Sequence, residues 1–275
     1  MKETNEGTTL FISSRSNPKI AEIARLDDAK YRRRSGLFIV DGIKLFREAV
    51  LSGYEIKCAV LREDAADKYE VEVPAGVIKY IVTSPVFERL TSERAPEGII
   101  GVVWQNGSRY VNLPPENVGN ANIGLILDGV QNPDNLGAIL RSANAFGIDG
   151  VLIGSADNVG AADPFGRKAQ RASMGAAMKL TIYHSDDLCG VCRELGKSKR
   201  LVAACLQKDS TTLDLFDFQP NDIVVIGNEG HGISDALLEL CREKIYIPMQ
   251  NGQESLNAAS AAAVMLWEVY KSRKA

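Results

Sequence analysis

Six short apolar runs recur through the second half of the 275-residue chain, and this recurrence constrains the fold more than any other feature. The runs show little polar alternation, which is typical of strands buried on both faces of a mostly parallel sheet. Helical patterns separate the runs, and a last helix is expected from about Ser255 to Tyr270. We therefore predict an α/β domain with strands at Ile123–Leu127, Gly150–Ile153, Lys179–Ile182, Leu201–Ala204, Ile223–Ile226 and Lys244–Ile247.

A second, smaller α/β domain is predicted before it, over residues 11–105. Ser16 or Asn17 can cap a helix whose first position is Pro18. Strands are expected at 36–40, 56–60, 78–82 and 99–104, with helices at 43–52 and 85–90. Residues 1–10 are expected to be disordered. Residues 106–121 carry Pro114-Pro115 and predict an extended linker, which leaves 122–275 as the second domain.

The stretch from Asn132 to Gly147 follows the first of the six runs and predicts a turn and then a helix. Asp134 or Asn135 can cap this helix, and Gly147 is placed to end it. Asn135, Gly137 and Arg141 are polar or small residues spaced along its first turns, and a helix N-terminus attracts anions. Taken alone, the stretch suits a scaffold element as well as a functional one.

Two later stretches repeat the arrangement of a buried strand followed by a polar turn. The run Ile223–Ile226 breaks into a glycine-rich turn that carries Glu229. The run Ile245–Ile247 is followed by Met249 and then by Glu254-Ser-Leu-Asn257, which leads into an alanine-rich helix. No Gly-x-Gly-x-x-Gly fingerprint follows the first strand and no P-loop is present, so a dinucleotide-dependent dehydrogenase is disfavoured.

In this order, the three stretches resemble the three motifs of the SpoU (TrmH) family of RNA ribose 2′-O-methyltransferases, within the SPOUT class. The resemblance covers roughly the last 150 residues closely. It implies a C-terminal SPOUT domain whose end is threaded into a trefoil knot, which ordinary topology rules would exclude. It also implies that the smaller domain is the substrate-binding domain that precedes the catalytic one, although Asp41-Gly42 stands where the family often has Glu-Gly.

The resemblance also implies a methyl donor and a set of site residues. The donor is S-adenosylmethionine, and the family's positions for it fall on Gly227, Ile247, Met249 and Leu256. Singly, Ile247 and Leu256 suit a hydrophobic core equally well. The expected catalytic residues are Arg141, Asn135, Glu229, Ser255 and Asn257, with Glu229 either paired with Arg141 or positioning the ribose. The plainer interpretation of Ser255 is a helix cap, and His231 suggests packing or RNA contact rather than a general base.

Arg141 matches the family's essential arginine, which has been proposed to deprotonate the hydroxyl. Holding a guanidine neutral at pH 7 costs roughly 9 kcal/mol relative to its reference pKa. A guanidinium that binds the adjacent phosphate and stabilises the forming alkoxide carries no such cost. We therefore expect Arg141 to act as a cation.

Charge is distributed unevenly, and the distribution favours RNA as the partner. The net charge is −3, yet between Arg15 and Arg47 there are nine Lys or Arg and four Asp or Glu. Such a cluster is often only a solvated surface, but it can also neutralise phosphates. The expected RNA contacts are Arg15, Lys19, Arg32, Arg33, Arg34 and Arg141.

The remaining expectations concern compartment, assembly and substrate. The chain has no signal peptide, membrane-spanning run or metal-binding pattern, and its five cysteines lack a framework spacing, so we expect a cytoplasmic protein without metal. The resemblance implies a homodimer and favours 23S ribosomal RNA over tRNA. The alternative from another class is a catalytically silent RNA-binding protein of the same fold, which an intact Arg141 disfavours.

Overall fold

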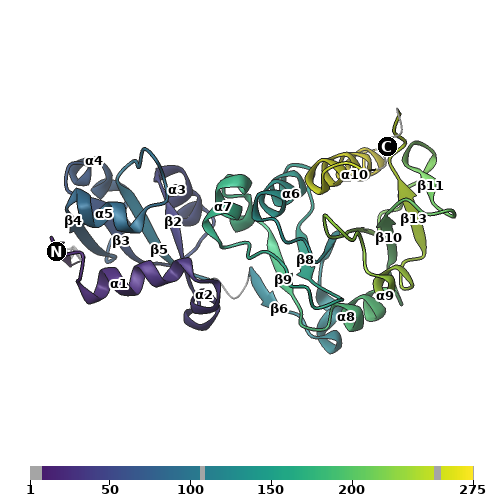
Figure 1. The fold of residues 1–275 in the computed structure, drawn as a ribbon, viewed down its shortest axis with the longest axis horizontal. Coiled ribbons are helices and arrows are strands. Elements are labelled where there is room, and N and C mark those ends of the chain that lie inside the picture. The colour runs from purple at the N-terminus through teal and green to yellow at the C-terminus, as the bar shows by residue number, and fades with distance from the viewer. Residues whose placement is uncertain (1–7, 106–108, 251–254, 275) are drawn as a thin grey trace, which may run out of the picture. The chain divides into compact units, whose positions relative to one another are not determined.

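The computed structural model describes residues 8–105, 109–250 and 255–274 (Figure 1). Its contacts divide the chain into an N-terminal unit, residues 1–106 with Phe165–Gln170, and a C-terminal unit, residues 107–164 with 171–275. Met1 to Gly7 lie outside the described residues. Thr9 and Leu10, which the sequence had placed in a disordered end, instead begin the first strand.

The N-terminal unit is built on a mixed five-stranded sheet among the described residues, in the order β1-β4-β3-β5-β2. Strands β1, β4 and β3 run parallel, and β5 runs antiparallel to both of its neighbours, β3 and β2. Its elements are β1 (Thr9–Ile12), α1 (Pro18–Ala24), η1 (Arg25–Asp27), α2 (Ala29–Ser35), β2 (Leu37–Asp41), α3 (Ile43–Leu51), β3 (Ile56–Arg62), α4 (Ala66–Tyr69), η2 (Glu70–Glu72), β4 (Ile78–Val82), α5 (Ser84–Leu90) and β5 (Ile99–Trp104).

Local sequence explains where the first helices of this unit begin and end. The side chain of Asn17 accepts a hydrogen bond from the Lys19 amide, and Pro18 takes the first helical position of α1. Helix α2 ends at Gly36, whose φ of 66° is a left-handed conformation that glycine adopts without strain. Ile20 and Ile23 of α1 and Leu26 of η1 belong to the apolar cluster that packs on the sheet, and Tyr31 of α2 packs against this cluster.

The segment Phe165–Gln170 belongs to the N-terminal unit although its sequence neighbours lie in the other one. The Phe165 ring lies 4.7 Å from the Phe38 ring, centroid to centroid. Gln170 Nε2 donates to the backbone oxygen of Ile39 at 3.0 Å. No local pattern predicted this return, because these contacts join positions more than 120 residues apart.

The C-terminal unit is built on an all-parallel sheet that has eight strands within the described part of the chain, ordered β11-β13-β10-β12-β7-β8-β9-β6. The mostly parallel α/β prediction is therefore confirmed. The strands are β6 (Tyr110–Asn112), β7 (Leu125–Asp128), β8 (Gly150–Gly154), β9 (Thr181–His184), β10 (Arg200–Ala204), β11 (Thr211–Thr212), β12 (Asp222–Ile226) and β13 (Glu243–Tyr246). The helices are η3 (Pro115–Asn120), α6 (Pro133–Ala145), η4 (Ala176–Met178), α8 (Leu188–Leu195), η5 (Leu213–Leu215), α9 (Asp235–Leu238) and α10 (Ala258–Ser272). Helix α7 (Arg167–Ser173) is divided, since its residues up to Gln170 belong to the N-terminal unit.

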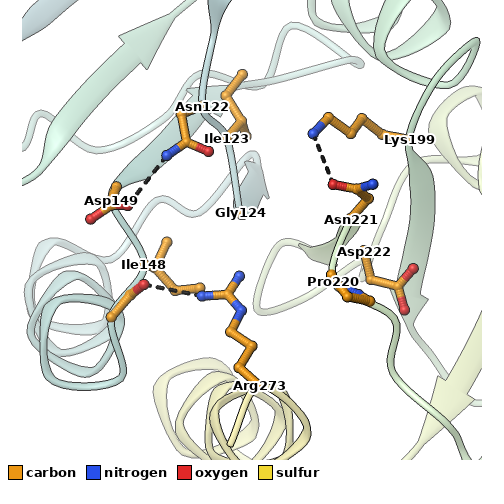
Figure 2. Close-up of a pocket in the computed structure, with 11 residues that line it drawn as sticks. Asn122, Ile123, Gly124, Ile148, Asp149, Lys199, Pro220, Asn221, Asp222 and Arg273 are labelled. Carbon is orange, nitrogen blue, oxygen red and sulfur yellow. Dashed lines mark hydrogen bonds between the residues drawn. The ribbon is translucent and has the colours of Figure 1, made fainter.

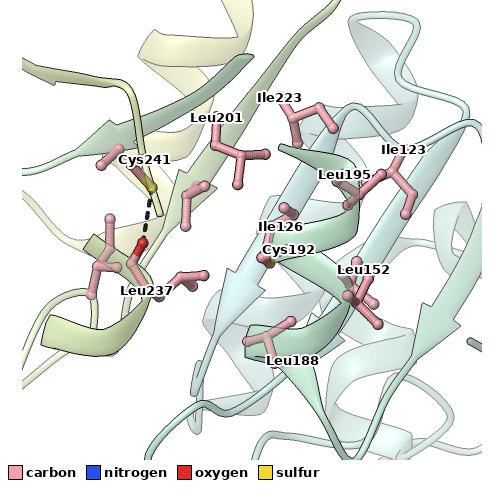
Figure 3. Packing of buried hydrophobic residues seen from close by; sticks show 14 of the residues in the cluster. Ile123, Ile126, Leu152, Leu188, Cys192, Leu195, Leu201, Ile223, Leu237 and Cys241 are labelled. Carbon is pink, nitrogen blue, oxygen red and sulfur yellow. Dashed lines mark hydrogen bonds between the residues drawn. The ribbon is translucent and has the colours of Figure 1, made fainter. Parts of the chain in front are cut away.

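Helices cover both faces of this sheet, with α6 and α10 packed together on one side and α8 and α9 on the other (Figure 1). Ile126, Leu152 and Ile223 point from the strands toward α8 and form one cluster with Leu188 and Leu195 (Figure 3). Side chains alternate along a strand, so Leu125 and Leu127 face the α6 side, and they are also fully buried. Burial on both faces explains the unbroken apolar runs.

The structure differs from the prediction of an extended linker over residues 106–121. Tyr110–Asn112 pair with β9 as a strand of the large sheet, and Pro115–Asn120 form a 3₁₀ turn rather than extended chain. Proline is tolerated in the first turn of a helix, because its missing N–H has no partner there. Leu113 and Val118 are buried in the cluster beneath α8, so this segment is part of the C-terminal unit. Residues 106–108 lie outside the described residues.

Candidate active site

The loops that follow β7 and β12 lie side by side, because these two parallel strands are neighbours in the sheet. In open α/β sheets, ligands bind outside the carboxyl ends of such strands. Asp128 ends β7, and its carboxylate accepts hydrogen bonds from the amides of Ala156 and Ser234, both at 2.9 Å. One buried carboxylate therefore ties the loops after β8 and β12 to the end of β7.

The loop after β12 is a tight turn that only this glycine pattern permits. Asn228 and Gly232 pair with each other through their backbones. A Cβ at Gly227 would stand 2.1 Å from the carbonyl carbon of Gly232, so no side chain fits there. Asn228 Nδ2 donates to the Gly129 oxygen at 2.7 Å. His231 is exposed on this turn, and its amide donates to Asn228 Oδ1.

The N-cap of α6 lies two to three residues earlier in the sequence than predicted. Asn132 is the N-cap, since its Oδ1 accepts from the amides of Asp134 and Asn135 at 2.8 and 3.4 Å. Pro133 occupies the first helical position. The prediction of Asp134 or Asn135 as the cap is wrong. Because Asn132 does the capping, the side chain of Asn135 can make other contacts.

Glu229 forms the centre of a hydrogen-bond network at this edge of the sheet. Its carboxylate accepts from the backbone amides of Gln131 at 3.2 Å and Asn132 at 3.1 Å, and from Asn135 Nδ2 at 2.9 Å. Burial disfavours the charged form, but these hydrogen bonds together outweigh it and lower the pKa of Glu229 below its usual value. The carboxylate is therefore ionised at neutral pH and suits positioning rather than proton transfer.

Asn257 joins this network from the third predicted stretch. Its Nδ2 donates to Asn135 Oδ1 at 2.9 Å, and its own Oδ1 accepts from the amides of Ala259 and Ser260. Asn257 is thus the N-cap of α10, a role that the sequence analysis had considered for Ser255. The structure brings Asn135, Glu229 and Asn257 together from three separate segments. Ser255 is exposed beside them in sequence, and Glu254 lies outside the described residues.

Arg141 is not in contact with this network. It lies on α6, six residues after Asn135, which corresponds to about 9 Å along a helix axis. The residue is exposed, and within the described part of the chain no hydrogen bond or ion pair to its guanidinium is found. Of the two roles expected for Glu229, pairing with Arg141 is not observed, and positioning of the ribose stays a prediction. Instead, the cation projects from the same helix that holds Asn135.

The residues expected to hold the cofactor lie at the same edge of the sheet. Gly227 is buried at the end of β12, and Ile247 and Met249 follow β13, which is separated from β12 only by β10. Ile247 and Met249 are half-buried, and Leu256 keeps 40% of its surface exposed. Apolar side chains left partly uncovered beside loop amides fit an adenosyl group.

The predicted RNA-binding residues of the N-terminal unit fall into different environments. Arg32 is buried, and its guanidinium donates to the backbone oxygens of Leu26 at 2.7 Å and Asp27 at 2.9 Å. Its expected contact with RNA is corrected by this finding, because a buried side chain that caps the η1 turn cannot reach a phosphate. Arg33 and Arg34 are exposed, and Arg15 and Lys19 are exposed but bonded to glutamates.

A small pocket of about 70 Å³ lies at the opposite, amino-terminal edge of the large sheet (Figure 2). Lys199 and Arg273 reach into it, where Lys199 Nζ donates to Asn221 Oδ1 at 3.3 Å and Arg273 Nη1 to the Gly147 oxygen at 3.1 Å. Its lining is polar and its place is away from the Glu229 network. It therefore does not suit the cofactor.

Sequence reasoning missed Asp128, Gln131, Asn132 and Asn228, which organise the site. Asn132 carried a usable signal, since an asparagine directly before proline after a buried strand is typical of a capped helix start. Asp128 and Asn228 carried none, because their partners come from other loops. The described residues contain no cluster of three potential metal ligands and no helix long and apolar enough to cross a membrane.

Comparison with known proteins agrees with this geometry. A model of the SpoU rRNA Methylase family matches residues 122–267, and a model of the MRM3-like substrate binding domain matches residues 17–101. An uncharacterised tRNA/rRNA methyltransferase of Synechocystis is 30% identical, over 95% of this chain and 94% of that protein. The 23S rRNA (guanosine(2553)-2′-O)-methyltransferase RlmP of Bacillus subtilis is 27% identical, over 94% of this chain and 98% of its own length.

Solved structures show the same likeness over the whole chain. An AdoMet-bound rRNA methyltransferase from Sinorhizobium meliloti superposes with a TM-score of 0.82 at 25% identity, covering 96% of this chain and 98% of that one. A putative RNA methyltransferase of the TrmH family from Porphyromonas gingivalis gives 0.79 at 28% identity, covering 94% and 99%.

Proposed function

The chain belongs to the SpoU rRNA Methylase family, and on that premise we propose that it transfers a methyl group from S-adenosylmethionine to a ribose 2′-hydroxyl of ribosomal RNA. Membership makes the protein an RNA methyltransferase with S-adenosylmethionine as its donor. The choice of the ribose hydroxyl and of ribosomal over transfer RNA is the proposed part. The full-length relative from Bacillus subtilis, named for both features, supports it.

The network of Asn135, Glu229 and Asn257 is the observation that carries the proposal. It places amide and carboxylate groups from three motifs at the carboxyl ends of β7 and β12, with hydrogen bonds of 2.9 Å on both sides of Asn135. Transfer to a weak oxygen nucleophile requires the hydroxyl and the methyl group to be aligned. The hydrogen bonds on both sides of Asn135 hold these groups in place and so supply that preorganisation.

The residues then divide between positioning and charge stabilisation. Glu229 holds the side chain of Asn135 and the amides that begin α6, and it stays ionised because its pKa is lowered. The exposed guanidinium of Arg141 binds the phosphate next to the target ribose and stabilises negative charge on the 2′-oxygen. Asn257, and Ser255 beside it, present further polar groups at the start of α10.

The donor would be held by Gly227, Ile247, Met249 and Leu256. When bound, it supplies an activated methyl group on a sulfonium. The half-buried apolar side chains after β13 would shield the adenosyl group from water, and the tight turn at Gly227 would allow backbone amides to approach it closely.

A homodimer is part of the same proposal. Helices α6 and α10 pack together, and α10 leaves Val264 and Trp267 exposed by 38% and 45%. The Trp267 ring also contacts Phe146 at the end of α6. Because Arg141 lies on α6 but away from the Glu229 network of its own chain, pairing of these helices would bring a partner's site close to it. We place the enzyme in the cytosol, where its five free thiols stay reduced.

Tritium transfer tests the proposal. The protein is incubated with methyl-labelled S-adenosylmethionine and with ribosomal or transfer RNA from a strain that lacks it. Arg141→Ala is compared with Arg193→Ala, which removes an exposed arginine from α8 of the same unit. Alkali-resistant label in ribosomal RNA, lost in Arg141→Ala and kept in Arg193→Ala, is the expected result.

Other outcomes each overturn one part of the proposal. Label mainly in transfer RNA would refute the preference for ribosomal RNA. Label removed with the base rather than the ribose would refute the 2′-hydroxyl as acceptor. No label in either pool, with S-adenosylmethionine binding also undetectable by calorimetry, would leave the catalytically silent RNA-binding protein.

A further inference from the structure

The cations of the N-terminal unit differ in whether a carboxylate neutralises them. Arg15 lies 3.5 Å from Glu88, and Lys19 lies 3.1 Å from Glu22. By contrast, Arg25, Arg33 and Arg34 on η1 and α2 make no ion pair within the described residues. Since an ion pair reduces the field that an approaching anion meets, the two groups should attract RNA to different degrees.

The acidic residues of η1 and α2 are engaged elsewhere. Asp27 is bonded to Arg167. Asp28 caps α2, with its Oδ1 accepting from the Tyr31 amide at 2.6 Å. Neither carboxylate is therefore available to Arg25 or Arg34. A positive surface remains on this short segment although the whole protein is acidic.

Tyr31 holds two of these cations in place. The guanidinium carbon of Arg25 lies 4.3 Å from the centroid of the Tyr31 ring, and that of Arg34 lies 5.3 Å from it. The ring itself packs against the apolar cluster of the unit, so it is a fixed support. Attraction of a guanidinium to a ring face restrains the side chain while its N–H groups stay accessible.

Two like charges over one ring repel each other, and a bound anion relieves this repulsion. Their guanidinium carbons are separated by no more than the sum of the two distances to the ring. Each guanidinium has a planar set of donors that matches two oxygens of a phosphate. Being held in advance, they lose less side-chain entropy on binding than free arginines do.

We propose that Arg25, Tyr31 and Arg34 form a clamp that binds the phosphate backbone of the substrate RNA. This clamp rests on the proposed function for the identity of its ligand. Arg32 is buried and fixes the η1 turn that carries Arg25, since its guanidinium donates to the backbone oxygens of Leu26 and Asp27. The clamp positions the RNA by charge, without reading its sequence.

Salt-dependent binding tests the clamp, with deproteinised ribosomal RNA as the probe and no S-adenosylmethionine present. The double variant Arg25→Gln, Arg34→Gln is compared with Arg47→Gln, Lys57→Gln, which removes the same charge from two glutamate-paired cations of the same unit. Each lost phosphate contact lowers the slope of log K against log salt by ~0.7–0.9. We expect a loss of about 1.4–1.8 for the clamp variant and little change for the control.

The tyrosine separates support from charge. Tyr31→Phe keeps the ring, so we expect RNA affinity equal to that of the wild type. Tyr31→Leu keeps both charges but removes their support, so affinity should fall severalfold with most of the salt slope retained. Circular dichroism and thermal unfolding of each variant confirm that it is folded.

Equal slopes for the two double variants would overturn the clamp, since general electrostatics would then explain binding. Equal RNA affinity for Tyr31→Leu and wild type would show that the Tyr31 ring is not part of the clamp. The assay is independent of methyl transfer. Clamp-dependent binding without transfer would refute the proposed function alone, and transfer with an unchanged slope in the clamp variant would refute the clamp alone.

Discussion

Asp41 in the N-terminal unit and Glu229 in the C-terminal unit are both held by several donors, but the donors differ. Asp41 ends β2 with 6% of its side chain exposed, and Arg167 Nη1 lies 3.0 Å from its Oδ2. Thr91 Oγ1 and the Ser92 amide also donate to it, at 2.9 and 3.1 Å. Glu229 is bound by two backbone amides and Asn135, and none of these donors is charged.

As a result, the pKa values of the two carboxylates are shifted in opposite directions. Burial raises the pKa of Asp41, and the hydrogen bonds and the charge of Arg167 offset only part of that effect. At Glu229 burial also raises the pKa, but the hydrogen bonds from Asn135 and from backbone amides together outweigh it and lower the pKa. The buried carboxylate of Asp41 is therefore bound by a cation, Arg167, whereas the carboxylate of Glu229 at the edge of the sheet is bound by neutral amides alone. This leaves Arg141, a cation on the same helix as Asn135, available for substrate.

The largest effect should follow from removing the cation of the first pair. Arg167→Ala leaves Asp41 buried without its charged partner and also removes donors to Asp27 and the Leu90 oxygen. We expect a loss of about 3–5 kcal/mol in the free energy of unfolding, measured by urea denaturation. Lys197→Ala, which breaks an exposed pair with Glu194, is the control and should change it by less than about 0.5 kcal/mol. Similar values for the two variants would contradict the structural role of Arg167.

Removing the neutral donor at Glu229 should act on catalysis instead of stability. Asn135→Ala breaks the link between Glu229 and Asn257, and a displacement of about 1 Å at a reacting group can cost ~10²-fold in rate. We expect a loss of methyl transfer of that order. Asn144→Ala, which changes an exposed residue of the same helix, should retain activity. Full activity in Asn135→Ala would show that the network is only structural.

Substitution of the N-cap of α6 tests how much Asn132 contributes to the stability of the helix that carries Asn135. Asn132→Ala removes the acceptor for the amides of Asp134 and Asn135 and should cost about 1 kcal/mol of stability. Asn132→Asp keeps the acceptor and should cost little. Thermal unfolding measures both variants, and equal melting temperatures for wild type and Asn132→Ala would exclude the capping role.

The smallest effect is in pH dependence, and its sign should differ between the two units. The lowered pKa of Glu229 gives stability that is present above its unfolded value, about 4.3, and is lost as pH falls through the folded pKa. The raised pKa of Asp41 gives stability that is present below its unfolded value, about 3.9, and is lost as pH rises through the folded pKa.

Variants isolate each contribution. Relative to Glu229→Gln, the wild type should lose stability as the solution is acidified below about pH 4.3. Relative to Asp41→Asn, it should gain stability as pH falls toward 3.9. Urea denaturation between neutral and acidic pH measures both differences. If the two stability differences changed with pH in the same direction, the opposite pKa shifts of Glu229 and Asp41 would be refuted.

Local pattern predicted the elements well where neighbours in sequence decide them. The strands Ile78–Val82 and Ile99–Trp104 appear with the predicted bounds, and Asn17 with Pro18 opens α1. The linker failed because the pairing of β6 with β9 joins Tyr110 to Ile182, far along the chain. Its prolines gave the local sequence the composition of a loop.

The sequence by itself determined the mostly parallel character of the large sheet, six of its eight described strands and the three motifs that bear the polar residues, because periodicity and turn chemistry act over a few residues. Only the tertiary structure decided that Glu229 binds Asn135 rather than Arg141, that Asn257 caps α10 and that Arg32 is buried. Each of these outcomes depends on donors and acceptors that compete in space. For Glu229 and Asn257, the partners lie 94 and 122 residues away, beyond the reach of any local pattern.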